Sequence, residues 1–200
     1  MTQPLASLPR QNHPAEGPVA ERSGRTEHSS FSASLSPQSF KDLFRGHPGG
    51  VAVITADAGD GPVALTATSV SSASAEPPLL TFSISALSSA SASLGRADTV
   101  VVHLLDADDL DIAKLGATSG IDRFADTSRW TRLATGEPVF AKVRAWVRCA
   151  VIGRMEAGSS TVIAAHALEA TISRGNDDET NALAYHNRTW HRLDERSRLS

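Results

Sequence analysis

Short apolar segments separated by Gly-, Pro- and Asp-containing turns run through most of this sequence, and they restrict the chain to few folds. GGVAVITAD is a β-branched run, GDGP is typical of a turn, and VALTATSV is the expected return strand, so residues 51–70 are predicted to form a hairpin. Further strands are expected at residues 78–85, 98–106, 141–158 and 160–175. Many antiparallel strands with few short helices favour an all-β protein, closed or partly closed as a barrel.

A helix is predicted before the first strand. In SPQSFKDLFRGHPGG, Ser36 is the expected N-cap and Pro37 occupies the first turn. Phe40, Leu43 and Phe44 fall on one face, and the following His-Pro-Gly-Gly ends the helix. The folded domain is therefore expected to begin at residue 36.

Composition limits the class of protein. The chain has 200 residues, 40% of them hydrophobic, and a net charge of −3, which suits one domain and argues against nucleic-acid binding. Cys149 is the single cysteine, so no internal disulfide is expected and a cytoplasmic location is predicted. We expect no membrane span, because no apolar run approaches ~20 residues, and no metal site, because no ligand motif occurs. Residues 1–35 are polar and without periodicity, which predicts a disordered tail before a domain at 36–195.

A hydroxyl-rich stretch, TATSVSSAS, interrupts the apolar pattern before Glu76-Pro77-Pro78, which is expected to hold an extended backbone. Small hydroxyl side chains leave backbone amides exposed, and such amides can hold a phosphate without a cation. A loop that only satisfies its own backbone is the other interpretation.

The order of these segments resembles the flavin reductase domain family, the reductase components of two-component flavin monooxygenases. GVAVIT, a turn, and ALTATSVSSASAEPPLL match the family's Gly-Val-x-Val-x-Thr strand, Thr-x-x-Ser strand end and acid before Pro-Pro-Leu. VVHLLD, with His103 where Asn is usual, IDRFA, TGEPVF and ALAYHNRTWHRL resemble later family segments, so the resemblance spans residues 38–194.

The resemblance implies a Greek-key split β-barrel of the FMN-binding type, dimeric, with the flavin at the subunit interface. It implies reduction of FMN or FAD by NADH or NADPH, with reduced flavin passed in many members to an oxygenase. Two alternatives stay open: a non-catalytic flavin-binding or sensor protein, and a flavin-dependent oxidoreductase acting on another small substrate.

The resemblance also implies a set of cofactor-binding residues. The segment at 66–69 would lie beside the flavin ring, with the later hydroxyls serving its phosphate or only a turn. Serines at 85–91 would contact the phosphate or ribityl chain, or one of Ser88 and Ser89 would merely cap a short helix. The flavin-binding residues expected in these two segments are Thr66, Ala67, Thr68, Ser69, Ser71, Ser72, Ser85, Ser88, Ser89 and Ser91.

Four further residues are expected at the flavin. Arg123 would pair with a phosphate or remain a solvated surface residue. Phe124 would cover the ring or fill the core. Trp190 would contact the ring edge or anchor an interface, and His186 would contact the pocket.

One motif departs from the family pattern. Where members often have Gly-Asp-His, whose His helps to place the nicotinamide, this chain has Gly158-Ser159-Ser160. Ser160 provides a hydroxyl but no imidazole, and His166 is expected to be structural. Hydride transfer needs stacked rings rather than an acid–base residue, so no residue is assigned as catalytic, and the departure concerns the nicotinamide more than the flavin.

Overall fold

The computed structural model describes residues 34–173 and 181–199. The disordered tail predicted for residues 1–35 lies almost wholly outside this part of the chain. The α-helices are α1 (Pro37–Arg45), α2 (Ser91–Arg96) and α3 (Leu110–Ala117), and the 3₁₀ turns are η1 (Ala107–Asp109) and η2 (Glu195–Ser197). The strands are β1 (Gly49–Gly50), β2 (Ala52–Asp57), β3 (Pro62–Ala67), β4 (Ser71–Ala75), β5 (Pro78–Ser85), β6 (Thr99–Leu104), β7 (Thr131–Arg132), β8 (Pro138–Val139), β9 (Ala145–Ala157), β10 (Ser160–Ile172), β11 (Ala182–His186) and β12 (Thr189–Leu193).

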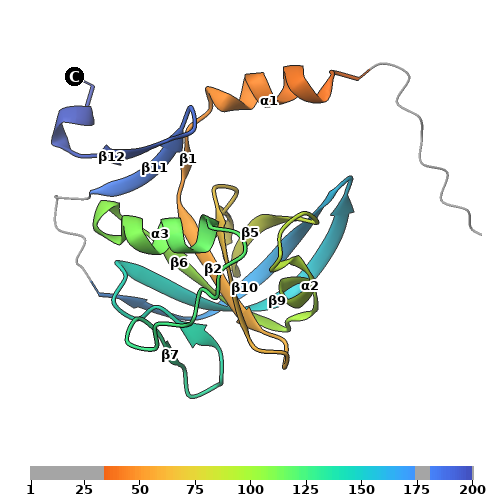
Figure 1. Ribbon diagram of the computed structural model, residues 1–200, viewed down its shortest axis with the longest axis vertical. Helices are drawn as coiled ribbons and strands as arrows, with labels where there is room; N and C mark the ends of the chain where they lie inside the picture. The colour runs from red at the N-terminus through yellow and green to blue at the C-terminus, as the bar shows by residue number, and fades with distance from the viewer. Residues whose placement is uncertain (1–33, 174–180, 200) are drawn as a thin grey trace, which may run out of the picture. The chain divides into compact units, whose positions relative to one another are not determined.

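Seven strands form one antiparallel sheet in the order β3-β2-β6-β9-β10-β5-β4 (Figure 1). The predicted hairpin is confirmed: β2 pairs with β3 from Ala52 opposite Ala67 to Asp57 opposite Pro62. The predicted long strands correspond to β9 and β10, although β9 begins at Ala145 rather than at residue 141.

The sheet curls because its two edge strands, β3 and β4, are consecutive in the chain and joined only by residues 68–70. The amide of Ser83 on β5 donates to Ser69 Oγ at 3.0 Å, which ties the end of β3 to the other side of the sheet. The result is a partly closed antiparallel barrel with few short helices, as the sequence predicts.

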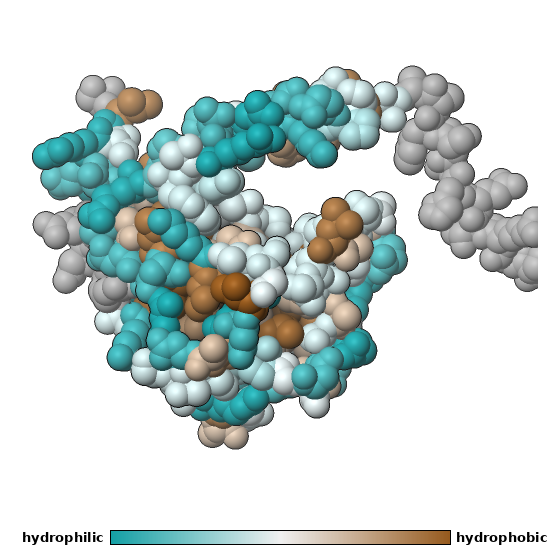
Figure 2. All heavy atoms as spheres, in the orientation of Figure 1, coloured by the Kyte–Doolittle hydropathy of each residue, from teal (hydrophilic) through white to brown (hydrophobic). Residues whose placement is uncertain are grey.

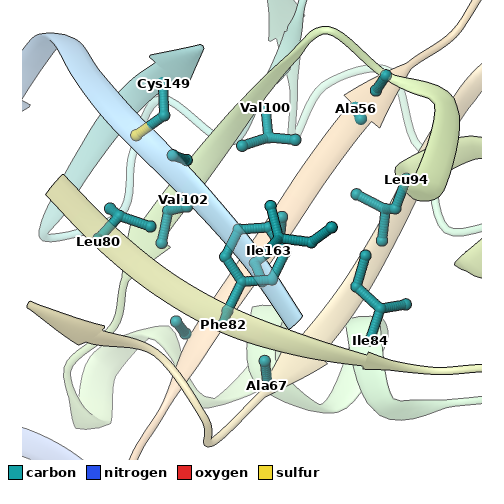
Figure 3. Close-up of a cluster of buried hydrophobic side chains, with 14 of the residues drawn as sticks. Ala56, Ala67, Leu80, Phe82, Ile84, Leu94, Val100, Val102, Cys149 and Ile163 are labelled. Carbon is teal, nitrogen blue, oxygen red and sulfur yellow. The ribbon is translucent and has the colours of Figure 1, made fainter. Parts of the chain in front are cut away.

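One hydrophobic core fills the inside of the curled sheet. Figure 3 shows Phe82 of β5 and Ile163 of β10 at its centre, with Val100 and Val102 of β6 beside them. These side chains are at most 1% exposed. Alternate residues of each strand enter this core, as the period of two of a β-strand requires.

A second core covers the opposite face of the same sheet. Val53 and Val101 point away from the barrel interior and pack with side chains of α3 and of the segment that follows it. α3 contacts β2 and β3 in this layer (Figure 1). Trp146 of β9 is only 7% exposed because this layer covers it.

The first helix begins as predicted, but its apolar face is not buried. The side chain of Ser36 accepts a hydrogen bond from the amide of Ser39 at 3.0 Å, and Pro37 lies in the first turn. Phe40, Leu43 and Phe44 are 51%, 66% and 52% exposed. Hydrophilic residues cover most of the visible side of α1 in Figure 2. A second sheet, in the order β1-β11-β12, begins with the strand that comes after this helix in the chain. The amide of Asn187, in the turn between β11 and β12, donates to the carbonyl of Arg45 at 3.0 Å, so this sheet contacts the end of α1.

Two local predictions were wrong. Ser71–Ala75 is strand β4, not a loop, because its backbone pairs with β5 and the turn at Glu76-Pro77, with a cis peptide bond, closes a hairpin instead of holding an extended backbone. The second helix is preceded by Ala90, without a side-chain cap, so neither Ser88 nor Ser89 caps it.

Candidate functional site

The end of strand β3 forms an open rim on the barrel. Thr68 and Ser69 are exposed there, immediately after buried Ala67. Thr66 is half-buried, and its Oγ1 donates to the carbonyl of Ala113 in α3 at 2.7 Å. Within the predicted segment at 66–69, the side chains of the last two residues therefore reach solvent, whereas the first two hold the rim against α3 and the core.

α3 packs closely against the end of β3. A Cβ atom added to Gly116 would lie 2.4 Å from Thr66 Oγ1 and 3.1 Å from the amide nitrogen of Thr66. Only glycine permits this spacing, so Gly116 sets how closely α3 approaches the strand that carries the predicted flavin segment.

Arg123 and Ser89 are in contact, although they are far apart in sequence. Arg123 Nη1 donates to Ser89 Oγ at 3.3 Å, and Nη2 donates to the carbonyl of Thr118 at 2.7 Å. The Nε atom of Arg123 is buried and has no hydrogen-bond partner among the described residues. Arg123 is thus partly fixed and has a buried donor that the described residues do not use, which argues against the freely solvated alternative.

The other serines of the second segment make local contacts. Ser85 Oγ accepts from the amide of Leu87 at 3.3 Å, and Ser88 Oγ accepts from the amide of Ala90 at 3.2 Å. Ser91 Oγ donates to the carbonyl of Ala86 at 3.5 Å. In this structure these hydroxyls stabilise the turn between β5 and α2, while the Ser89 hydroxyl faces Arg123.

The serines of β4 lie apart from these groups. Ser71 and Ser72 are exposed and pair with Thr81 and Leu80 across the β4–β5 hairpin. Neither belongs to the cleft described below.

Phe124 lies in the core rather than at a surface. It is 6% exposed, stacks on Phe140 with ring centroids 5.6 Å apart, and meets the edge of Trp130 at 5.0 Å. Of the two roles weighed for Phe124, the structure shows the core role: the ring is buried, with Phe140 stacked on it and Trp130 in an edge contact.

The closing hairpin carries the two remaining predicted residues. Trp190 packs against Tyr185 with ring centroids 4.7 Å apart, and His186 lies 5.6 Å from His191. Tyr185, rather than Trp190 or His186, faces the adjacent cleft. The contacts of Trp190 and His186 with a flavin stay predictions.

A cleft of about 620 Å³ lies between α1, the β11–β12 hairpin and the exposed end of β3. Its volume is in the range of small-molecule sites. The residues that line it are Phe40, Lys41, Phe44, Arg45, His47, Gly49, Thr68, Ser69, Tyr185, Asn187 and Arg188. Thr68 and Ser69 are the only residues in this list that the sequence pattern predicts for a site. The helix before the first strand carries apolar and basic residues, and this composition is the feature of the sequence that indicates the others.

The Gly158-Ser159-Ser160 motif, which differs from the family pattern, lies beside the serine-rich segment at residues 85–91. Ser160 pairs with Ser85 across β10 and β5, and the amide of Ala86 donates to the carbonyl of Ser159 at 2.9 Å. Antiparallel pairing therefore brings Ser160 to the same end of β5 as the turn that carries Ser89. His166 pairs with Leu79 six residues further along β10, so it lies well away from that end.

Buried titratable groups near the barrel are structural. His103 is fully buried, with Nδ1 donating to the carbonyl of Val53 at 2.9 Å and Nε2 accepting from the amide of Phe140 at 3.0 Å. Burial lowers the pKa of His103 to about 4. Burial also raises the pKa of the Cys149 thiol to about 11, which leaves that group protonated and unreactive.

The arrangement fits a flavin. Thr68 and Ser69 are exposed residues that line a cleft large enough for a flat ring, and Arg123 with Ser89 offers cationic and hydroxyl donors to a phosphate. The unpartnered Nε of Arg123 is the donor that such an anion would satisfy. Among the described residues, no group of three or more His, Cys, Asp or Glu side chains is placed to hold a metal ion, and no helix is long and apolar enough to cross a membrane.

Known proteins share this sequence and fold. The chain is 39% identical over 164 residues to an NADH:FMN oxidoreductase of Rhodococcus erythropolis, covering 81% of this chain and 84% of that protein. It resembles the crystal structure of a flavin reductase domain protein from Arthrobacter sp. FB24, with a TM-score of 0.72, 28% identity and coverage of 78% and 94% of the two chains.

A third similarity is to the Streptomyces globisporus C-1027 NADH:FAD oxidoreductase SgcE6, solved in complex with NAD and FAD fragments, with a TM-score of 0.70 and 26% identity. The match covers 82% of this chain and 98% of that one. Residues 44–194 match the family model described as flavin reductase like domain. The protein is therefore a member of the flavin reductase like domain family.

Proposed function

We propose that this protein is an NAD(P)H:flavin oxidoreductase that reduces FMN or FAD. The observation that carries the proposal is the contact of Arg123 with Ser89, in the turn that follows β5, together with the hydrogen bond that joins Ser83 of β5 to Ser69 at the exposed end of β3. Relatives named NADH:FMN oxidoreductase match four-fifths of the chain and support the same reaction.

The proposed flavin site has two parts. Residues 66–69 hold the ring through backbone groups, with Thr66 fixed to α3 and Thr68 and Ser69 open to the ligand. Arg123, Ser89 and the neighbouring serines at 85, 88 and 91 hold the phosphate and ribityl chain through amides, hydroxyls and one guanidinium. Bound flavin supplies the two-electron acceptor, and the protein supplies position and hydrogen-bond donors.

Ser160 is the residue that we propose beside the nicotinamide. It stands where relatives of the family often have His, and its pairing with Ser85 brings it next to the proposed phosphate segment. Its hydroxyl can bond a carboxamide group. No proton needs to be moved by a side chain, because the protein's part in this reaction is to hold two rings in contact.

Several wider features belong to the same proposal. We propose a domain spanning residues 36–195 that works as a homodimer, because the apolar side chains of α1 are half exposed in the single chain. We propose a cytoplasmic location, since the single cysteine provides no internal disulfide. We also propose that reduced flavin is passed to an oxygenase; one solved neighbour, BorF, is described as the flavin reductase component of a two-component tryptophan halogenase.

Steady-state oxidation of NADH and NADPH with each of FMN and FAD tests the proposal. The expected result is a loss of reduced nicotinamide that depends on added enzyme and flavin and saturates with both substrates. A protein that binds flavin but leaves both nicotinamide nucleotides unoxidised would instead be a flavin-binding protein without reductase activity.

A further inference from the structure

We infer that Gly49 is a positioning residue for the flavin, because the absence of a side chain at this position allows Thr68 to lie close against β1. The inference rests on the proposed function, which places residues 66–69 beside the flavin ring. Gly49 and Thr68 both line the cleft at the end of β3, so their contact lies at the proposed site itself. Gly49 acts through Thr68 and does not touch the reacting atoms.

Thr68 lies too close to Gly49 to leave room for a side chain there. A Cβ atom added to Gly49 would lie 2.9 Å from the Cβ atom of Thr68 and 2.9 Å from its carbonyl oxygen. Non-bonded carbon atoms are most stable at about 3.5–4.0 Å, so both contacts would be repulsive. The carbonyl oxygen belongs to the backbone and cannot rotate away as the end of a long side chain can. A side chain at position 49 therefore requires either β1 or Thr68 to move.

β1 is held in place by its pairing with β11. Gly49 lies opposite Tyr185 in this pair, and the amide of Val51 donates to the carbonyl of Leu183 at 3.2 Å. Thr68, in contrast, follows the last residue of β3 and lies beyond the ladder that joins β2 to β3. The displacement caused by a side chain at position 49 therefore falls on Thr68 rather than on β1.

The residues on both sides of Thr68 are anchored, so this displacement stays local. Thr66 Oγ1 donates to the carbonyl of Ala113 in α3 at 2.7 Å. The amide of Ser83 in β5 donates to Ser69 Oγ at 3.0 Å. Because α3 and β5 hold the two neighbours, the peptide groups of Thr68 are the part of the segment that moves.

The peptide groups of exposed Thr68 are among those that the proposed function assigns to the flavin ring. Hydrogen bonds weaken steeply when donor and acceptor are misaligned. Hydride transfer also needs both rings at near-attack distance, and a misplacement of about 1 Å can slow a reaction roughly a hundredfold. Glycine in a strand often marks a place where a ligand or another backbone approaches closely. Gly49 fits this description, since the Thr68 backbone approaches it at the cleft.

Gly49→Ala tests the inference in the full chain, with Gly46→Ala as the matched control. Gly46 lies three residues earlier, between α1 and β1. Its φ of −83° suits alanine, and a Cβ atom there would meet nothing within 4 Å. Both variants make the same chemical change in the same connection, but only Gly49→Ala presses on Thr68.

Three measurements on bound FMN report the position of Thr68. We expect Gly49→Ala to raise the Kd for FMN about tenfold, the effect of losing about one hydrogen bond. We expect kcat at saturating NADH and FMN to fall about tenfold, because the ring is held in a less productive position. The visible absorption spectrum of bound FMN should also differ from that in the unchanged protein, whereas Gly46→Ala should match the unchanged protein in all three measurements.

Urea unfolding separates this role from a purely structural one. If Gly49→Ala lowers only the free energy of unfolding, or prevents folding, the glycine serves the fold and the inference is wrong. Equal Kd, kcat and spectrum in Gly49→Ala, Gly46→Ala and the unchanged protein also overturn it. An unchanged protein that binds FMN without oxidising NADH or NADPH refutes the proposed function, but its Kd and spectrum still test Gly49. An unchanged protein that binds no flavin refutes both.

Discussion

Arg123 Nη1 lies 3.3 Å from Ser89 Oγ, so a guanidinium group and a hydroxyl that are 34 positions apart in the chain share one corner of the barrel rim. The contact joins the segment after α3 to the segment before α2. The pair supplies both a cation and a hydroxyl to one place on the surface.

Replacing Arg123 should weaken flavin binding. We expect Arg123→Gln to raise the Kd for FMN about tenfold, because one charge-assisted hydrogen bond to an anion is lost. Quenching of flavin fluorescence on binding measures this Kd. Arg129→Gln is the control, since Arg129 pairs with Asp111 and does not reach Ser89; an equal loss in both variants would mean that general surface charge, not the phosphate site, is responsible.

Replacing glycine by alanine at two helical positions should change the free energy of unfolding in opposite directions. Gly116→Ala is expected to lower the free energy of unfolding by about 1–3 kcal/mol, because the new Cβ meets the side chain and backbone of Thr66. Gly95→Ala in α2 is expected to raise the free energy of unfolding by up to about 1 kcal/mol, because no atom beyond its chain neighbours and its own helix backbone lies within 4 Å of the new Cβ, and alanine favours the helix. Urea unfolding of both variants measures the difference, and a gain in stability for Gly116→Ala would contradict the close packing of α3.

The free energy of unfolding should decrease as the pH is lowered, because of His103. Burial lowers the pKa of His103 to about 4, below its ordinary value of 6.5. Between these values the unfolded chain binds a proton that the folded chain does not, so acid favours unfolding by about 1.4 kcal/mol per pH unit and by roughly 3 kcal/mol in total.

His103→Asn tests this origin, since an amide side chain keeps a donor and an acceptor but does not titrate. Unfolding free energies measured between pH 6.5 and 4.5 should decline steeply for the unchanged protein and much less for the variant. Parallel slopes for the two proteins would show that other groups cause the acid sensitivity.

The buried ion pair between Glu137 and Arg148 should contribute more to the free energy of unfolding than exposed ion pairs do. Glu137 is 5% exposed, and its Oε1 accepts from Arg148 Nε at 2.7 Å. Burial opposes ionisation of Glu137, but hydrogen bonds from Thr135, Thr99 and Arg148 outweigh it and lower the pKa of the carboxyl to about 2. We expect Glu137→Gln to cost about 3 kcal/mol at pH 7, because Arg148 keeps a buried charge without a counter-ion.

The contribution of Glu137 is present above its ordinary pKa of 4.5 and disappears as the pH falls towards 2. Thermal unfolding at pH 7 and pH 3 should therefore show a smaller gap between variant and unchanged protein in acid. Glu76→Gln, at an exposed turn, is the control and should change stability little at either pH. A gap that does not shrink in acid would place the cost of Glu137→Gln in packing rather than in charge.

Features that depend on neighbouring residues could be predicted from the sequence. The Ser36 cap with Pro37, the hairpin of β2 and β3, and the mostly β architecture all follow from capping groups, turn residues and alternation within short windows. The order of short motifs also identified the family, because each motif is local even though their sum spans the domain.

Which side chains contact one another depends on how the whole chain packs. Whether Ser71–Ala75 is a loop or a strand depends on β5 being there to pair with it, and whether Phe124 covers a ligand or fills the core depends on Phe140. The contact of Arg123 with Ser89 and the basic cleft beside α1 join segments that no sequence window contains. Whether a side chain is buried, and which other side chains it contacts, are properties of the packed chain. Local sequence preferences restrict these outcomes but do not determine them.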